Sequence, residues 1–477
     1  MNELIAMTAL ALRERLRAGE VTPLEVLDAL EAHVAATDGP VNALPTLCFE
    51  RARGAAGAVD PASLLAGMPV PIKDLTDVAG VRTTYGSPAF ADHVPPASGI
   101  LVERLEANGA LIFAKSNTPE FGAGAQTFNP VLGVTRNPHD TRMSAAGSSG
   151  GAAAALATGQ AWLAHGSDMG GSLRNPASFC GVVGLRPSPG RVASDPGPRI
   201  DDTLSAEGPM ARNVADCALM LDAMVGLDRR SPFSLPAPRT PFLAAAQERR
   251  VPRRVAYSEG LGFMPVDPEV AAITRAAALR LAEAGVEVIE ATPDFAEAHD
   301  AFAVLRARAF AVKFEELYET RRELLKRDIV WNVELGRRLT PADVTRAERA
   351  RQRMFLGAAE FFASHDLLLS PATIVPAFAV TQRFVAECAG QRFANYVEWL
   401  GIAYAITLIA SPALSLPCGF TEAGLPFGLQ IAAPPRGEAA IFAAAQVLED
   451  ILAVDLRPIA PRIRHAADED ALAVLMA

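Results

Sequence analysis

Two serines in glycine-rich loops are the residues of this chain whose setting favours nucleophilic chemistry. Ser148 lies within Gly147–Gly151, directly before an alanine-rich stretch that predicts a helix. Ser172 follows 24 positions later and is preceded by Gly170 and Gly171. Consecutive glycines let backbone N–H groups converge on one oxygen, and a helix N-terminus favours negative charge. The pattern predicts a nucleophilic serine beside an oxyanion-binding loop.

A lysine upstream of both loops is a candidate base. Lys73 follows the apolar segment 68–72, which predicts a buried strand. Arginine supplies 40 of the 44 basic residues, so a lysine in an apolar setting indicates a property that arginine lacks. A buried lysine can lose its proton, whereas an arginine stays charged. Because a serine hydroxyl needs a base to become a useful nucleophile, these residues together predict hydrolysis through a serine-bound acyl intermediate.

Longer segments around these residues resemble the amidase signature family. The matching segments are Pro71–Asp74, Gly109–Phe121, Gly147–Gly151, Gly166–Ala177 and Ser411–Gly419. The resemblance is dense over residues 64–215 and 366–455 and thin between them. Two positions depart from the family pattern: Ala146 stands where a glycine is usual, and Ala152 stands where a serine is frequent. Neither departure touches the candidate catalytic residues.

The resemblance implies a Ser–cis-Ser–Lys triad. In that triad Ser172 is the nucleophile, Ser148 is the bridging serine that follows a cis peptide bond, and Lys73 is the terminal base. The backbone N–H groups of the implied oxyanion hole belong to Met169, Gly170, Gly171 and Ser172. Ser149, Asp168 and Arg174 are expected to support the two loops. No cofactor and no metal is expected.

The elements that must position these residues predict an α/β fold, with a large mixed central β-sheet flanked by helices on both faces. Residues 1–63 predict a helical segment that includes a capping box at Thr22–Glu25. Residues 64–227 alternate short strands with helices and hold the candidate triad. Residues 228–365 predict a variable, largely helical region that contributes to the substrate pocket, and residues 366–477 are expected to complete the sheet.

Composition and charge exclude several other classes of protein. A net charge of −10 argues against a surface that binds nucleic acid, because phosphates require clustered cations. The longest apolar run, residues 401–420, is broken by Pro412 and Pro417, so it predicts a buried strand and turn rather than a membrane span. Five widely spaced cysteines and no signal-peptide pattern favour a cytoplasmic protein. The protein is expected to be a monomer or a homodimer.

The substrate is expected to be a small, neutral and fairly hydrophobic amide, anilide or carbamate, as for an acylamidase or a urethanase, with possible side esterase activity. The sequence shows no cluster of positively charged residues of the kind that would indicate a carboxylate substrate. Several aromatic residues in the weakly matching region are candidates for an apolar pocket lining. They are Phe263, Phe302, Phe310, Trp331, Phe384, Tyr396 and Trp399.

Two alternative functions fit parts of the sequence. The loop at Gly147–Gly151 also fits the nucleophile elbow of α/β-hydrolases, with Ser149 as the nucleophile of an esterase. That fold needs a histidine, for which His299, His365 and His465 are available. The resemblance also allows an amidase component of a multi-chain amidotransferase that is inactive without its partners.

Overall fold

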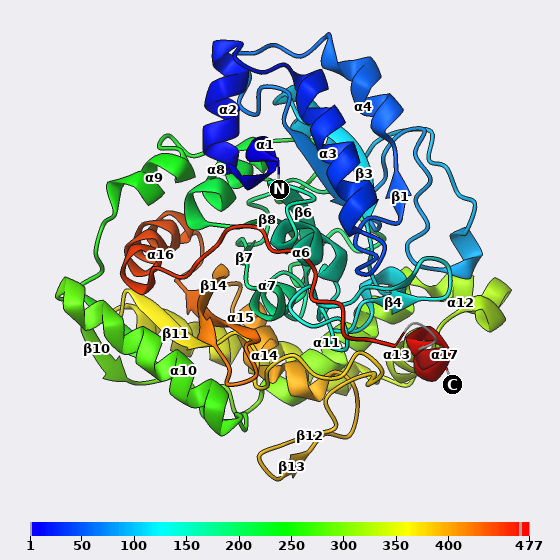
Figure 1. Cartoon of the computed structure of the whole chain (residues 1–477). Helices are drawn as coiled ribbons and strands as arrows, with labels where there is room; N and C mark the ends of the chain where they lie inside the picture. Colours follow the sequence, from blue (N-terminus) through cyan, green and yellow to red (C-terminus); the bar gives the residue numbers. More distant parts are fainter. Residues whose placement is uncertain (1, 467–469, 477) are drawn as a thin grey trace.

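An eight-stranded mixed sheet forms the centre of the molecule in the computed structural model, which describes residues 2–466 and 470–476 (Figure 1). The order of its strands is β10-β9-β11-β15-β14-β7-β8-β6. Their bounds are β6 Leu163–Asp168, β7 Val183–Arg186, β8 Ala206–Ala211, β9 Arg254–Tyr257, β10 Glu287–Glu290, β11 Leu367–Pro371, β14 Ala413–Phe420 and β15 Pro426–Ala432. The pairs β10–β9 and β9–β11 are parallel and the other neighbours are antiparallel, so the sheet is mixed as predicted.

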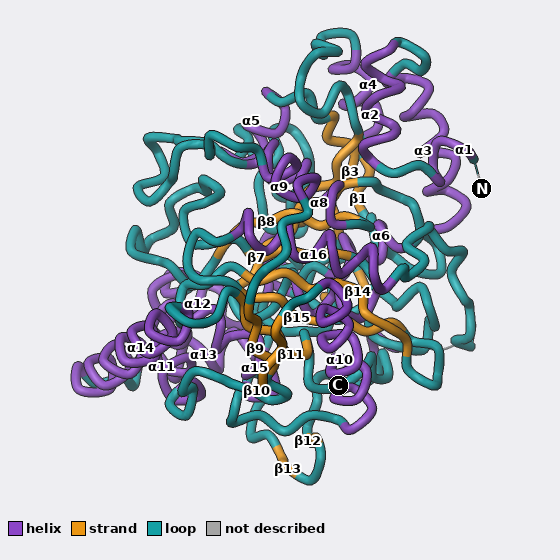
Figure 2. Tube along the Cα trace, turned by 90° about the vertical axis from the view of Figure 1, so that its left-hand side faces the viewer, coloured by secondary structure: helices purple, strands orange, loops and turns teal. Residues whose placement is uncertain are grey.

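Helices cover both faces of this sheet (Figures 1 and 2). One group consists of α8, α9, α10 and α16, of which α8, α9 and α16 contact one another. Helices α6 and α7 pack together beneath the loops that carry the two candidate serines, and α7 contacts β7, β14 and β15. The bounds are α6 Gly150–Ala157, α7 Arg174–Cys180, α8 Val214–Met224, α9 Phe242–Glu248, α10 Pro268–Leu279 and α16 Glu438–Leu452. Burial from both sides explains why β11 and β15 are buried along their whole length.

A smaller three-stranded sheet, of order β1-β3-β2, places the candidate base against the large sheet. Strand β2 contacts β6, and Lys73 is its last residue. The N-terminal helices cover this sheet at the top of Figure 1. The bounds are β1 Thr46–Leu47, β2 Pro69–Lys73, β3 Leu111–Ser116, α1 Glu3–Ala6, α2 Ala9–Ala18, α3 Pro23–Thr37, α4 Phe49–Ala56 and α5 Ile100–Ala107.

A layer of longer helices closes the other side of the site. Helix α11 contacts α13, α14 and α15. Its bounds and those of its neighbours are α11 Ala298–Lys313, α12 Glu315–Arg321, α13 Arg327–Arg337, α14 Pro341–Phe362 and α15 Gly401–Leu408, with α17 at Ala471–Met476. Two short hairpins complete the fold, β4–β5 (Phe128–Asn129 and Gly133–Val134) and β12–β13 (Glu387–Cys388 and Gln391–Arg392).

Local sequence signals located several of these elements. The capping box is present, since the side chains of Thr22 and Glu25 each bond the other's backbone N–H, and the helix that follows runs over Pro23–Thr37. The interpretation of residues 401–420 as strand and turn was wrong for its first part, because Gly401–Leu408 forms the buried helix α15 and only Ala413–Phe420 is a strand. An apolar run without polar positions carries no periodicity that separates a buried helix from a buried strand.

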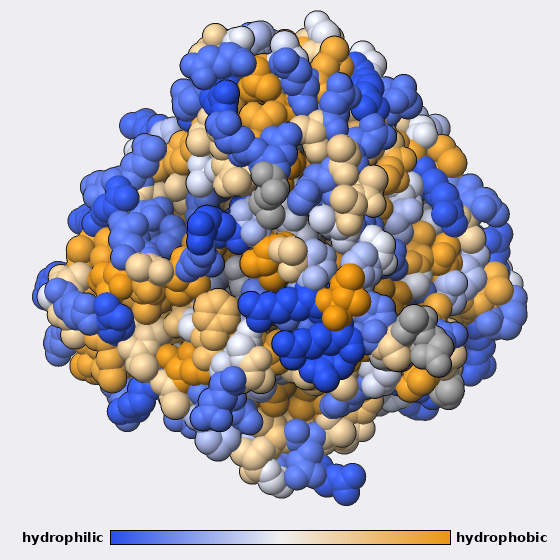
Figure 3. Space-filling model, in the orientation of Figure 1, coloured by the Kyte–Doolittle hydropathy of each residue, from blue (hydrophilic) through white to orange (hydrophobic). Residues whose placement is uncertain are grey.

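The surface alternates between hydrophilic and hydrophobic side chains over the face shown in Figure 3. Among residues 2–466 and 470–476, no helix combines the length and apolar character that crossing a bilayer requires. All five cysteines are free thiols. The division of the chain at residues 64, 228 and 366 stays a prediction, although β9 and β10 show that the region between residues 228 and 365 also adds strands to the central sheet.

Candidate active site

The ammonium group of Lys73 lies among three serine hydroxyls. Its Nζ is 2.7 Å from Ser148 Oγ, 2.8 Å from Ser149 Oγ and 3.1 Å from Ser167 Oγ. Strand β2 brings Lys73 to this point, the loop before α6 brings Ser148 and Ser149, and β6 brings Ser167. The peptide bond between Gly147 and Ser148 is cis, as the resemblance implied.

The surroundings of Lys73 favour its neutral form. The side chain is fully buried, and this burial lowers its pKa from 10.5 to about 7, against the opposing attraction of Glu207 and Asp168. The Lys73 backbone N–H donates to Nδ1 of the buried His165, whose Nε2 lies 2.6 Å from a carboxylate oxygen of Glu207. Near neutral pH this lysine is therefore balanced between its two protonation states, as proton transfer requires.

Ser172 lies in the turn between β6 and α7 and opens onto the same cavity as Ser148. Its backbone carbonyl accepts a hydrogen bond of 3.2 Å from the N–H of Ser149, which fastens the two serine loops to each other. The preceding residue, Gly171, has φ +108°, and a Cβ at that position would lie 2.5 Å from Asn175 Oδ1 and 2.7 Å from the Ala403 side chain. Only glycine fits there, which explains the second glycine of the motif.

Asp168 organises the loop that precedes Ser172. Its carboxylate accepts hydrogen bonds from the N–H groups of Gly171, at 2.9 Å, and Leu173, at 3.0 Å. Burial alone would raise the pKa of Asp168, but Arg174 and Arg186 outweigh that effect and hold it below its usual value. The N–H of Gly171 is thus already engaged, whereas those of Met169, Gly170 and Ser172 have no acceptor among the described residues.

Ser149 is the second serine of its loop whose side chain lies beside Lys73. Its side chain is fully buried, and its Oγ bonds Lys73. The histidines that an α/β-hydrolase mechanism would need are engaged elsewhere, since His299 bonds Tyr404, His365 stacks on Phe361 and His465 contacts Thr141.

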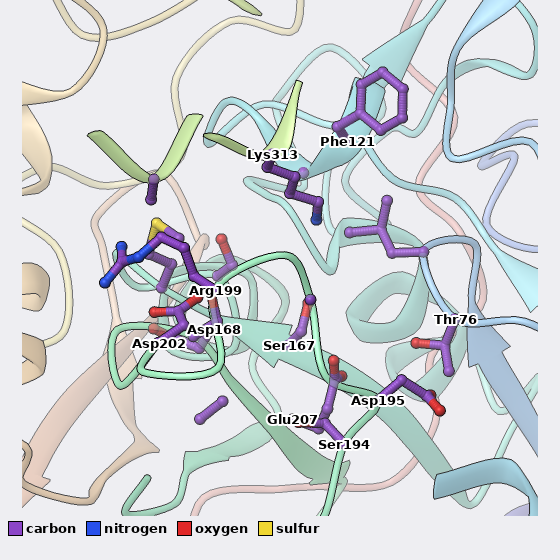
Figure 4. A pocket seen from close by; sticks show the side chains of 18 of the residues that line it. Thr76, Phe121, Ser167, Asp168, Ser194, Asp195, Arg199, Asp202, Glu207 and Lys313 are labelled. Carbon is purple, nitrogen blue, oxygen red and sulfur yellow. The ribbon is translucent and has the colours of Figure 1, made fainter. Parts of the chain in front are cut away.

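A cavity of about 690 Å³ opens beside the two serines. Aromatic residues form part of its lining. Figure 4 shows the polar side chains that β6, β8 and the segment between residues 194 and 207 contribute to it. The aromatic lining consists of Tyr85, Phe121, Phe233, Phe302, Phe310, Phe314 and Tyr396. The cavity thus offers an apolar surface to a substrate held at Ser172.

The sequence identified three of these seven aromatic residues. Phe302, Phe310 and Tyr396 line the cavity as predicted, whereas the other four candidates do not. Those four are Phe263, Trp331, Phe384 and Trp399. Four residues were missed, namely Tyr85, Phe121, Phe233 and Phe314, and only Phe121 lay in a segment that the resemblance had singled out. Over the part of the chain that the structure describes, no group of three or more metal-ligating side chains is present.

The sequence model of the Amidase family matches residues 25–442 of this chain. The chain belongs to the amidase signature family. Members of this family are hydrolases of carbon–nitrogen bonds, and this amidase shares their mixed sheet and helices. The loops around Ser148 and Ser172 lie within the matched range.

Relatives of this amidase are named for different activities. The acylamidase of Rhodococcus erythropolis is 34% identical over 455 residues, covering 93% of this chain and 95% of the relative. A glutamyl-tRNA(Gln) amidotransferase subunit from Moorella thermoacetica is 35% identical over 478 residues, covering 94% and 97%. Among solved structures, a bacterial aryl acylamidase superposes with a TM-score of 0.87 at 25% identity, covering 95% of this chain and 99% of that chain.

Proposed function

We propose that this amidase hydrolyses amide-type bonds through an acyl-enzyme on Ser172, with Ser148 and Lys73 as the proton relay. The observation that carries the proposal is the buried Lys73 ammonium group, 2.7 Å from Ser148 Oγ, beside a cavity that Ser172 also lines. Neutral Lys73 accepts the proton of Ser148, and Ser148 accepts the proton of Ser172. Ser172 Oγ then attacks the substrate carbonyl carbon.

The oxyanion formed by this attack needs hydrogen-bond donors that are not already engaged. The N–H groups of Met169, Gly170 and Ser172 fulfil that condition, whereas the N–H of Gly171 already donates to Asp168. Gly171 instead supplies the backbone bend that the loop requires. Collapse of the tetrahedral intermediate expels the amine, which takes the relayed proton, and water then releases the acid from Ser172 by the reverse sequence of proton transfers.

The cavity supports the proposed substrate class. Its aromatic lining supports a fairly hydrophobic amide, anilide or carbamate, and the acylamidase relative and the aryl acylamidase structure support the same class. The expectation that the substrate is neutral draws no such support, because Arg306 and Lys313 also face the cavity. A second candidate function is the amidase component of a multi-chain amidotransferase, which the similarity to the Moorella protein favours.

Labelling with a fluorophosphonate, followed by peptide mass spectrometry, tests the nucleophile. We expect the label on Ser172, its loss in Ser172→Ala, and its retention in Ser149→Ala, which removes a neighbouring hydroxyl as a matched control. A label on Ser149 would restore the elbow mechanism. Hydrolysis of 4-nitroanilides by the isolated chain separates the two candidate functions, because an obligate amidotransferase component needs its partners.

A further inference from the structure

Helix α11 carries two cations to the wall of the catalytic cavity. Arg306 and Lys313 both line the cavity that contains Ser148 and Ser172. They are seven residues apart, which is two helical turns and about 10 Å along the axis, so they lie on one face of the helix. Phe302, one turn before Arg306, belongs to the same face and also lines the cavity. The helix therefore presents a stripe that is both aromatic and cationic.

Arg306 has no acidic partner. Its side chain donates to Asn332 Oδ1 and to Tyr396 Oη, the latter at 2.7 Å, and its guanidinium lies 4.1 Å from the centroid of the Phe310 ring. These bonds use two of the five N–H donors of an arginine. The residue is only 7% exposed, and no carboxylate of the described residues forms an ion pair with it. A buried guanidinium that lacks a counter-ion in the protein is suited to an anionic ligand.

Lys313 differs from the other lysines of the chain. Lys73 and Lys115 are buried, Lys326 is largely buried, and all three are hydrogen-bonded, whereas Lys313 forms neither a hydrogen bond nor an ion pair with any described residue. Figure 4 shows its side chain reaching into the cavity toward the wall that carries Ser167. This lysine is thus held where a substrate can reach its ammonium group.

The acidic groups of the cavity lining do not neutralise Lys313. Desolvation by the surrounding protein lowers the pKa of Lys313, and the charges of Asp202 and Glu207 oppose that effect from a distance. Neither forms an ion pair with it: Glu207 bonds His165, and Asp202 accepts the N–H of Leu204. The cation thus remains available to a ligand.

The position of α11 indicates which part of the substrate meets these cations. Phe302 lies against Gly170, because a Cβ on that glycine would be 3.4 Å from the Phe302 ring. Met169 packs against the cluster that contains Phe310. Gly170 and Met169 belong to the proposed oxyanion loop, which holds the acyl carbonyl. Helix α11 therefore lies against the loop that would hold the acyl carbonyl.

We propose that Arg306 and Lys313 form a subsite for a carboxylate on the acyl portion of the substrate, so that the amidase prefers monoamides of dicarboxylic acids to neutral amides. The inference rests on the proposed function, since it uses the same cavity and nucleophile. The methylene chain of such a substrate packs along Phe302 and Phe310, and its terminal carboxylate reaches the ammonium group of Lys313. The subsite adds no covalent step to the proposed mechanism.

The rate at which Ser172 is labelled by matched alkyl fluorophosphonates tests this subsite. Each pair of probes has a chain of two to five methylenes that ends either in a carboxylate or in the isosteric isopropyl group. For at least one chain length we expect the carboxylate probe to label about tenfold to a hundredfold faster, as for a charge-assisted hydrogen bond. Lys313→Met should abolish that preference, and Lys313→Glu should reverse it. For each variant the preference is the ratio of the two labelling rates measured on that same variant.

Arg346→Met is the matched control, because it removes one positive charge from the exposed surface of α14, where Arg346 forms an ion pair with Asp343. This variant should keep the preference of the unmodified protein. A preference near one at every chain length, or an equal preference in Lys313→Met and Arg346→Met, would overturn the subsite while leaving Ser172 as nucleophile. Failure of both probes to label Ser172 would instead overturn the proposed function, and the subsite with it.

Discussion

Replacing Lys73 by methionine should destroy activity and at the same time stabilise the fold near neutral pH. The folded protein holds the pKa of this lysine near 7 instead of 10.5, because the side chain is fully buried. Between these two values the unfolded chain binds one proton more than the folded chain, so the stability of the unmodified protein rises with pH across this window. Below pH 7 the shifted pKa of Lys73 lowers the free energy of unfolding by the full amount of about 5 kcal/mol, and above pH 10.5 this destabilisation is absent.

Urea unfolding of the unmodified protein and of Lys73→Met, at pH 7 and at pH 9.5, measures this cost. The difference in unfolding free energy between the two proteins should change by about 3 kcal/mol over those 2.5 pH units, in favour of the unmodified protein at the higher pH. Loss of the bonds to Ser148 and Ser149 shifts both values together and does not alter the change with pH. Other titrating groups are common to both proteins and cancel.

The same proton controls turnover. With the pKa of Lys73 near 7, kcat/KM should fall about tenfold per pH unit below 7 and reach a plateau above it. Two results together would refute the reasoning that Lys73 acts as a neutral base. The difference in unfolding free energy between the two proteins would stay constant within about 0.5 kcal/mol from pH 7 to 9.5, and kcat/KM would stay flat down to pH 5.

Four further outcomes are expected. Ser172→Ala should lower turnover at least about a thousandfold with an unchanged melting temperature, and circular dichroism together with an anilide assay checks both. Lys73→Arg should be nearly as inactive as Lys73→Ala, because a fixed charge accepts no proton; an active arginine variant would mean that Lys73 acts only electrostatically. Glu207→Gln removes a charge that raises the pKa of Lys73, so the acidic limb of the kcat/KM profile should move to lower pH, and an unmoved limb would contradict this. Burial raises the pKa of Glu449 from 4.5 to about 7, so the unmodified protein loses stability as pH rises through that range. In urea unfolding, Glu449→Gln should therefore be more stable than the unmodified protein at pH 8, by up to about 3 kcal/mol. An equal gain in stability at pH 4 would point to another cause.

Sequence alone indicated the candidate active site because its residues lie in short motifs with local geometric demands. Gly171 has to be glycine since its φ is +108° and its Cβ would meet Asn175, so the requirement is visible in the chain itself. The capping box at Thr22 is local in the same way. Helix α15 was mistaken because its burial comes from distant elements, which leave no polar positions to mark the helical period.

The cavity was less predictable because its walls come together only in the folded chain. Tyr85 and Phe314 line one cavity although 229 positions separate them, and neither stands in a pattern that marks a binding site. Likewise, Arg306 and Lys313 lie among other charged residues of a charged helix, so no cationic cluster was visible along the sequence. They line the same cavity as Ser172 because of how α11 packs against α13, α14 and α15.

The scarcity of lysine in the chain bears on both the candidate active site and the cavity beside it. A chain that uses arginine for 40 of 44 basic positions retains lysine at three fully or largely buried positions and at one position in the catalytic cavity. At Lys73 the proposed role is proton transfer, which arginine cannot perform. At Lys313 a compact ammonium on a flexible stem can follow carboxylates on chains of different length, which the planar guanidinium of Arg306, held by Asn332 and Tyr396, cannot do. Substituting Lys313 by arginine should therefore keep the preference for a carboxylate but narrow the range of chain lengths over which it holds.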